Sequence, residues 1–254
     1  MTARGLFITG TDTGVGKTRV AVALIHALRA RGLRVAAMKP VSAGHVPQGD
    51  IDAPCGYSDP LRAEVPRGGM ESPVTGELNE DVLALLQATN VAAELRDVNP
   101  YAFADPIAPH IAARQAGVRI DLAVIVAAYS RLAAKADVVV VEGAGGWRVP
   151  LNEREDMADL AQALGLPIVL VVGLRLGCLN HALLTAESIA ARGLSWAGWV
   201  GNTIEPEMAQ LAANLETLGA RLPGPCLGVQ DFIPAPVLAA DWPQWLMLPE
   251  TLVS

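Results

Sequence analysis

A glycine-rich loop stands between a short apolar run and a longer helical pattern near the N-terminus, and it constrains the fold more than any other feature. The apolar run covers residues 5–10, the loop reads GTDTGVGKT over residues 10–18, and an Ala- and Leu-rich helical pattern follows over residues 18–31, ending before Gly32. Glycines let backbone N–H groups converge on a phosphate, and a helix N-terminus adds partial positive charge. This order therefore predicts a nucleotide-phosphate loop in an α/β fold.

The loop supplies groups for a nucleotide and a divalent metal ion. Lys17 provides a mobile cation, and the hydroxyl of Thr18 suits Mg²⁺. Five residues separate Gly10 from Gly16, one more than in the usual loop, so the spacing is a variant. A glycine-rich turn with an incidental Lys-Thr pair is the alternative, which the strand–loop–helix order disfavours. The residues expected to bind the nucleotide here are Asp12, Thr13, Gly14, Val15, Gly16, Lys17 and Thr18.

Apolar runs and helical patterns alternate along the rest of the chain. The strand-like runs cover residues 33–38, 137–141, 167–172, 196–200 and 225–228, and the helical patterns cover residues 79–89, 122–135, 157–164, 180–192 and 207–218. Such alternation gives βαβ units, and runs that are apolar on both faces mark central parallel strands. We expect one P-loop ATPase-like domain over residues 1–254, with a doubly wound, mostly parallel sheet and helices on both faces. An irregular Gly- and Pro-rich insertion is expected at about residues 44–78, and the Pro-rich segment 99–109 cannot be a helix interior.

Two charged residues follow strand-like runs and are candidates for the same site. Glu142 ends the run 137–141 and precedes the glycine-rich sequence GAGG, which includes Gly145 and allows close approach of a phosphate or substrate. Ligands of open α/β sheets bind at the carboxyl ends of strands, and beside a phosphate loop an acid there is commonly associated with Mg²⁺. Lys39 follows the run 33–38 and, with Lys17, would neutralise a transferring phosphoryl group. The alternatives are a solvated carboxylate and a surface lysine.

Composition excludes several classes of protein. A hydrophobic fraction of 52% with 18% charged residues excludes a disordered chain. A net charge of −7 and 4% aromatic residues argue against a nucleic-acid-binding protein. The three cysteines indicate reduced thiols, and neither a membrane span nor a secretory signal is apparent. We expect a soluble cytoplasmic protein that binds neither nucleic acid nor membrane.

Several blocks, in this order, resemble those of the dethiobiotin synthetases of biotin biosynthesis. They are residues 10–18, Lys39-Pro40, EGAGGW at 142–147, VGLRLGCLNHALLT at 172–185 and GWVGN at 198–202, and the resemblance extends to about Gly228. It implies a ligase that uses Mg²⁺ and ATP. In that family 7,8-diaminononanoate takes up CO₂ as a carbamate on one amine, ATP phosphorylates it to a carbamic-phosphoric anhydride, and the second amine closes dethiobiotin, releasing ADP and phosphate.

The resemblance also implies roles for individual residues. Lys17, Lys39 and Thr13 would be catalytic, and Asn202 and Gly228 would join the loop in binding the nucleotide. Thr18, Asp81 and Glu142 would bind the metal, with Glu80 as a near alternative to Asp81. The residues that would contact the substrate are Thr13, Lys39, Ser42, Gly145, Gly177, Cys178 and Asn180. Ser42 stands one residue before Ala43, the position at which the family usually has a hydroxyl.

Gly177, Cys178 and Asn180 begin a helical pattern, and free N–H groups at a helix N-terminus suit a carboxylate. In the family this element binds the terminal carboxylate of the substrate across a homodimer interface, so Cys178 would act through its backbone. A capped helix, with Asn180 as a local hydrogen-bonding group, is the alternative.

Two other functions stay open. One is a nucleotide-switch ATPase or GTPase that acts through protein partners, but Asp12 stands where related switch ATPases carry a second signature lysine. The other is a phosphate-loop kinase of a small acid, which the blocks at 142–147 and 172–185 disfavour. Glu205, three residues after Asn202, resembles part of the Asn-x-x-Asp pattern of guanine binders and leaves the base preference open.

Overall fold

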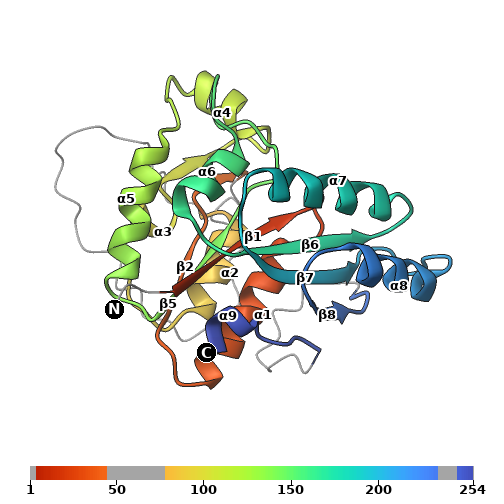
Figure 1. Ribbon diagram of the computed structural model, residues 1–254. Coiled ribbons are helices and arrows are strands. Elements are labelled where there is room, and N and C mark those ends of the chain that lie inside the picture. The colour runs from red at the N-terminus through yellow and green to blue at the C-terminus, as the bar shows by residue number, and fades with distance from the viewer. Residues whose placement is uncertain (1–3, 45–77, 234–244, 254) are drawn as a thin grey trace.

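The computed structural model of the protein describes residues 4–44, 78–233 and 245–253, and Figure 1 shows the path of the chain. Nearly all of the insertion expected at residues 44–78 therefore lies outside the described residues, as does Cys55. Of the cysteines that are described, Cys178 and Cys226 are free thiols. In the described parts of the chain, no helix is both long enough and apolar enough to cross a membrane.

A six-stranded parallel sheet forms the centre of the fold, with the strand order β2-β5-β1-β6-β7-β8. Its strands are β1 (Arg4–Gly10), β2 (Val35–Met38), β5 (Val138–Glu142), β6 (Ile168–Leu174), β7 (Trp196–Thr203) and β8 (Cys226–Gln230). Every one was expected from the sequence, and all the pairings between them are parallel. The doubly wound, mostly parallel sheet is thus confirmed. β7 runs beyond the expected residue 200 to Thr203, which places Asn202 inside the sheet.

Helices cover both faces of this sheet (Figure 1). They are α1 (Lys17–Ala30), α2 (Glu80–Ala88), α5 (Leu122–Ala133), α6 (Met157–Leu164), α7 (Cys178–Ala191) and α8 (Leu211–Arg221). Side chains of β1 alternate between two apolar clusters: Leu6 and Ile8 pack with α1 and α2, and Phe7 packs with α5 and α6. Both sides of the strand are buried, which is why its sequence is a continuous apolar run.

A second, two-stranded sheet was not expected from the sequence. β3 (Val41–Ala43) pairs in parallel with β4 (Tyr101–Phe103), which falls within the Pro-rich segment 99–109. The short helices that the sequence did not indicate are α3 (Leu95–Val98), α4 (Pro109–Gln115) and α9 (Glu250–Val253). The buried amide of Asn99 joins this region to the main sheet, because its Nδ2 donates to the carbonyl of Lys39 at 2.7 Å. This bond fixes the chain where it leaves β2.

The segment at residues 245–248 lies along β8, which is an edge strand of the main sheet. The N–H of Met247 donates to the carbonyl of Leu227 at 2.7 Å, and Leu246 is buried. At Gly228 the contact is so close that a Cβ would lie 2.1 Å from the carbonyl oxygen of Trp245, and φ is +153°. Only glycine fits there. The segment is therefore packed directly against the strand.

Candidate active site

The glycine-rich loop connects β1 to α1 at the carboxyl edge of the sheet. Gly14 and Gly16 have φ values of +73° and +87°, which favour glycine, and Gly16 is the N-cap of α1. The loop is held by β6: the N–H of Thr11 donates to the carbonyl of Val171 at 3.0 Å. A Cβ at Gly173 would lie 2.7 Å from the side chain of Val15. These contacts give the loop a fixed base beside an open helix N-terminus, the arrangement that binds phosphate.

Lys17 is buried at the start of α1 and turns back onto the loop. Its Nζ donates to the carbonyl of Asp12 at 3.0 Å. Burial and the positive charge of Lys39 lower the pKa of Lys17 to about 8. The loop therefore holds a lysine whose charge is costly until an anion arrives.

A cluster of three oxygen-bearing side chains surrounds Lys39. The hydroxyl of Thr18 bonds to Asp81 Oδ1 at 2.7 Å and to Glu142 Oε1 at 2.9 Å. Lys39 Nζ pairs with Asp81 Oδ2 at 2.8 Å and with Glu142 Oε1 at 2.5 Å. Thr18, Lys39, Asp81 and Glu142 come from α1, the end of β2, α2 and the end of β5. Glu80, the alternative to Asp81, is exposed.

The charges of this cluster depend on burial. Burial alone would lower the pKa of Lys39. The negative charges of Glu142 and Asp81 have the larger combined effect, so this pKa lies above its ordinary value. Burial alone would raise the pKa of Asp81. The positive charge and hydrogen bond of Lys39 have the larger effect and hold this pKa below its ordinary value. For Glu142, which is wholly buried, burial prevails and raises the pKa.

The oxygens of this cluster fit a hard divalent cation. Glu142 Oε2 is buried and, in the part of the chain that the structure describes, has no hydrogen-bond partner. An orphaned buried carboxylate oxygen is unfavourable unless a ligand satisfies it. Mg²⁺ prefers carboxylate, hydroxyl and phosphate oxygens, which is the set of donors that Thr18, Asp81, Glu142 and a nucleotide would offer.

The glycine-rich turn after Glu142 packs against the phosphate loop. Gly145 has φ +64°, and the hydroxyl of Thr13 lies 3.5 Å from where its Cβ would be. A Cβ at Gly146 would lie 3.8 Å from the Cα of Asp12. Trp147 anchors the turn, because it is buried and its Nε1 donates to the Ser188 hydroxyl of α7 at 3.0 Å. The turn, the phosphate loop and α7 therefore form one connected unit.

Asn202 lies under the start of α1. Its Nδ2 donates to the carbonyl of Val15 at 2.8 Å, and a Cβ at Gly16 would lie 2.1 Å from the same nitrogen. Its Oδ1 is buried and, within the described residues, lacks a partner. The amide thus has one free acceptor beside the phosphate loop. Gly228 lies in β8 under Trp245, and Glu205 is exposed after β7.

The N-terminus of α7 has no side-chain cap, although the N–H of Cys178 is already bonded to the carbonyl of Arg175 at 3.0 Å. Gly177 is the N-cap with φ +94°, and no side chain caps the helix, so the alternative in which Asn180 caps it is not supported. Cys178 is buried and a free thiol. Leu176, just before the cap, is 97% exposed, and Leu184 on the same helix is 57% exposed. Two exposed leucines therefore lie near this helix end.

Comparisons with known proteins identify the family. A model of the AAA domain matches residues 4–240. A protein of Pseudomonas paraeruginosa, named ATP-dependent dethiobiotin synthetase BioD, is 48% identical over 92% of this chain and 93% of its own length. A protein of the same name from Nitrosospira multiformis is 49% identical over 90% of this chain and 88% of its own length. Another, from Aromatoleum aromaticum, is 48% identical over 93% of this chain and 96% of its own length.

The chain belongs to the dethiobiotin synthetase family. It is therefore an enzyme of the ATP-dependent ligase class, as the sequence blocks indicated. Solved structures resemble this family member in fold: MinD of Aquifex aeolicus has a TM-score of 0.52 at 14% identity, and the MinC:MinD complex of that organism has 0.53 at 15%. Each match covers 91% of this chain, together with 84% of the MinD chain and 82% of the chain in the complex. At such low identity these matches establish the P-loop ATPase fold alone.

Ser42 is the predicted site residue that the structure places least favourably. It is buried in β3, and its hydroxyl donates to Asn99 Oδ1 at 2.9 Å. Successive residues of a strand point to opposite faces, so Ser42 and Ala43 face opposite sides. The hydroxyl of Ser42 is therefore already engaged by the protein, and its contact with substrate stays a prediction.

Sequence reasoning missed Asn99 and Arg175. Asn99 bonds to both Lys39 and Ser42, and Arg175 pairs with Asp12 of the phosphate loop. Asn99 has no role of its own in the sequence-based prediction. Arg175 lies three residues beyond the expected run 167–172 and directly follows the observed end of β6 at Leu174.

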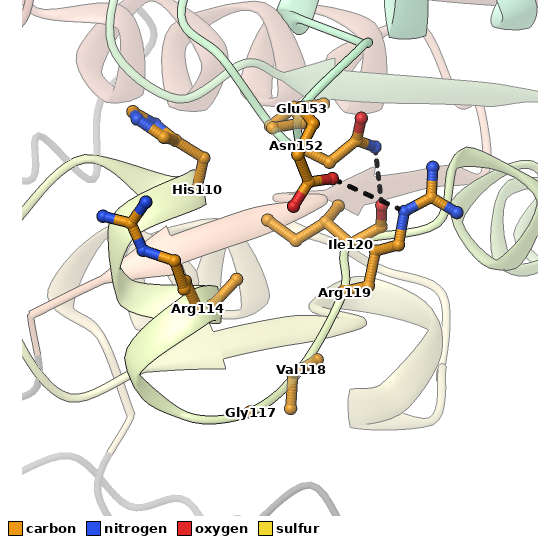
Figure 2. A pocket seen from close by; sticks show the side chains of 10 residues that line it. His110, Arg114, Gly117, Val118, Arg119, Ile120, Asn152 and Glu153 are labelled. Atoms are coloured by element: carbon orange, nitrogen blue, oxygen red, sulfur yellow. Dashed lines mark hydrogen bonds and ion pairs between the residues drawn. The ribbon is translucent and has the colours of Figure 1, made fainter.

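A hollow of about 260 Å³, shown in Figure 2, is lined by other residues. Its polar side chains include His110, Arg114, Arg119, Asn152 and Glu153, and none of the predicted site residues lines it. The ion pair of Arg119 with Glu153 spans 3.9 Å between exposed side chains, and Asn152 Nδ2 donates to the carbonyl of Ile120 at 2.9 Å. The hollow is thus a surface feature separate from the phosphate loop.

Proposed function

We propose that the protein joins CO₂ to 7,8-diaminononanoate and closes the product to dethiobiotin, consuming ATP with Mg²⁺. The observation that carries this reaction is the 48% identity, over 92% of the chain, to a relative named ATP-dependent dethiobiotin synthetase. The cluster of Lys17, Lys39 and two carboxylates beside the phosphate loop supports the residue roles. The likeness to MinD concerns the fold alone, so no observation favours a switch function.

The proposed reaction needs positive charge more than a nucleophilic side chain. One amine takes up CO₂ as a carbamate, and a carbamate oxygen attacks the γ-phosphorus of ATP, so that ADP leaves. The second amine then attacks the carbonyl of the carbamic-phosphoric anhydride, phosphate leaves, and the cyclic urea is complete. Carbamate and γ-phosphate repel each other unless cations lie between them. Lys17 and Lys39 lie at the same edge of the sheet and would supply that charge.

Thr18, Asp81 and Glu142 would hold the magnesium ion. Glu142 Oε2, which is buried and has no partner among the described residues, supports this assignment, as does the 2.7 Å bond between Thr18 and Asp81. The bound ion would supply neutralising charge to the β- and γ-phosphates. Asp81 is preferred to Glu80 because its carboxylate lies within the cluster.

The nucleotide base would meet Asn202. Its Oδ1, which has no partner in the described part of the chain, is the acceptor, because Nδ2 already donates to Val15. An acceptor there suits an amino group such as N6 of adenine. ATP as the co-substrate rests on the name of the relatives, ATP-dependent dethiobiotin synthetase.

The substrate carboxylate would bind the N-terminus of α7, and the active form would be a homodimer. The N–H of Cys178 bonds to the carbonyl of Arg175, so the N–H groups of Leu179 and Asn180, which no side chain caps, would bind the anion. The exposed Leu176 and Leu184 supply apolar area next to that helix end for a second copy of the chain. Thr13, which lies beside Gly145, would contact the carbamate or the transferring phosphoryl group.

The test is product formation by the purified full chain. The protein would be incubated with diaminononanoate, ¹³C-labelled bicarbonate, Mg²⁺ and ATP, and the products would be analysed by mass spectrometry. We expect dethiobiotin that carries the label, formed in step with ADP, and a strong loss of both with Lys17→Gln. ADP release without labelled cyclic urea would contradict the proposal and favour a switch ATPase.

A further inference from the structure

An ion pair joins the phosphate loop to the segment before α7. Arg175 Nη2 lies 2.6 Å from Asp12 Oδ2, although 163 residues separate the two in the sequence. The side chains are 37% and 46% exposed, so the pair is accessible to solvent but held at short range. Arg175 is not one of the residues proposed to bind or convert the substrates.

Asp12 connects this pair to the reactive part of the loop. Its Oδ1 accepts the N–H of Thr13 at 2.7 Å, and its main-chain carbonyl accepts Lys17 Nζ at 3.0 Å. Thr13 and Lys17 are both candidate catalytic residues. The orientation of the Asp12 carboxylate therefore affects the positions of both.

The charge of Asp12 is unfavourable in a loop that receives phosphates. A carboxylate near a polyphosphate repels it, and the repulsion weakens binding unless a cation neutralises the carboxylate. Within residues 4–44, 78–233 and 245–253, Arg175 is the basic side chain that forms an ion pair with Asp12. Removing Arg175 would leave the Asp12 carboxylate without its ion-pair partner beside the nucleotide.

Arg175 also contacts the start of α7. It follows β6, which ends at Leu174, and its carbonyl accepts the N–H of Cys178 at 3.0 Å. Thr11 and Asp12 of the loop and three residues of α7 line one hollow of about 330 Å³; those three are His181, Leu184 and Thr185. The loop and this helix thus face each other across that hollow.

We propose that Arg175 is a positioning residue that neutralises Asp12 for nucleotide binding and links the phosphate loop to the N-terminus of α7. Nucleotide bound at the loop then favours binding of a carboxylate at that helix end, and the reverse holds by linkage. The link to α7 rests on the proposed function, because the carboxylate is that of diaminononanoate. The neutralisation of Asp12 depends only on the nucleotide.

The first test uses Mg·ADP and calorimetric titration of the full chain. Exposed ion pairs contribute little, so Arg175→Gln should weaken the affinity by about two- to fivefold. Arg175→Lys should retain most of it, and adding Asp12→Asn to Arg175→Gln should restore it, because the unpaired charge is removed. Unchanged affinity in Arg175→Gln, or no recovery in the double variant, would overturn the proposal.

A matched control is Arg34→Gln. Arg34 forms an exposed ion pair with Asp137 at 2.7 Å, and both residues lie outside the candidate site. This variant should bind Mg·ADP like the unmodified protein. Thermal unfolding of every variant would be recorded, and the recovery in the double variant separates charge neutralisation from loss of structure.

The second test measures the link to α7. In the unmodified protein Mg·ADP should slow amide hydrogen exchange at residues 176–182 and tighten diaminononanoate binding, and both effects should decline in Arg175→Gln but persist in Arg34→Gln. Effects of equal size in Arg175→Gln would refute the link. Failure of the unmodified protein to bind diaminononanoate would instead refute the proposed function, and hydrogen exchange would still decide the link.

Discussion

Thr18 and Asp81 are joined by a hydrogen bond of 2.7 Å, although 63 residues separate them in the sequence. Each is the second residue of its helix, α1 and α2, so two helix N-termini meet next to the buried Glu142. Asn79 fixes Asp81 within this arrangement, because its side chain accepts the N–H of Asp81 at 3.1 Å and donates to the carbonyl of Gly44 at 2.6 Å. Helix capping thus selects which of two adjacent acids enters the site.

Asp81→Asn should raise the Mg²⁺ concentration needed for half-maximal turnover by about tenfold or more, because a charged oxygen ligand becomes neutral. Glu80→Gln is the matched control one residue away, and its metal titration should not change because Glu80 is exposed. Titration of dethiobiotin formation with Mg²⁺ would measure both. The reverse pattern would assign the metal to Glu80.

Lys17→Gln should reduce kcat by about 10²-fold or more, because a cation that stabilises the transferring phosphoryl group is lost. The substitution keeps a side chain of similar length, so the thermal unfolding temperature should change little. Steady-state turnover and a melting curve would be compared with those of the unmodified protein. Near-normal kcat in a folded variant would remove Lys17 from the catalytic set.

Nucleotide affinity should fall as the pH rises through about 8, because burial and Lys39 lower the pKa of Lys17 to that value. Below it the side chain is charged and attracts phosphate; above it the free protein must first take up a proton. Binding of ADP near this pH should therefore consume protons. Calorimetry in buffers with different ionisation enthalpies would detect the uptake, which should be absent in Lys17→Gln.

Ser42→Ala should lower the free energy of unfolding by about 1 kcal/mol, because the bond to the buried Asn99 is lost. The KM for diaminononanoate should stay within about twofold, since a hydroxyl already bonded inside the protein adds little to substrate binding. Denaturant unfolding and steady-state kinetics would separate the two effects. A large rise in KM with unchanged stability would instead show direct contact with substrate.

Leu176→Asp and Leu184→Asp should each convert the proposed dimer to a monomer with greatly reduced turnover, because a charge would be buried in an apolar contact. Val124→Asp is the control, since Val124 is 46% exposed on α5. Sedimentation velocity would report the oligomeric state. A fully active monomer, in the variants or in the unmodified protein, would contradict the shared site.

The main sheet was predictable because its strands are buried on both faces. Their sequences are therefore continuous apolar runs. β3 and β4 were missed because each has three residues, and both lie next to prolines that disguise any pattern. The fold places Ser42 and Ala43 on opposite faces, which the sequence alone did not reveal.

The site was predictable where a residue follows a strand that leads to the common edge, as Lys39 and Glu142 do. The choice between Asp81 and Glu80 was not, because it depends on how the Asn79 cap orients the start of α2. Arg175 was missed because its partner is 163 residues away in the sequence and only the packing of β6 beside β1 brings them together.

The segment at residues 245–248 has a consequence for solubility. Unpaired N–H and C=O groups on a sheet margin can recruit strands from other molecules. Residues 245–248 of the same chain cover this edge of β8. The N–H of Met247 bonds to the carbonyl of Leu227, and Trp245 packs closely on Gly228. A chain truncated before Trp245 would leave the edge of β8 open to intermolecular strand pairing. Its first defect would be aggregation and not slow catalysis.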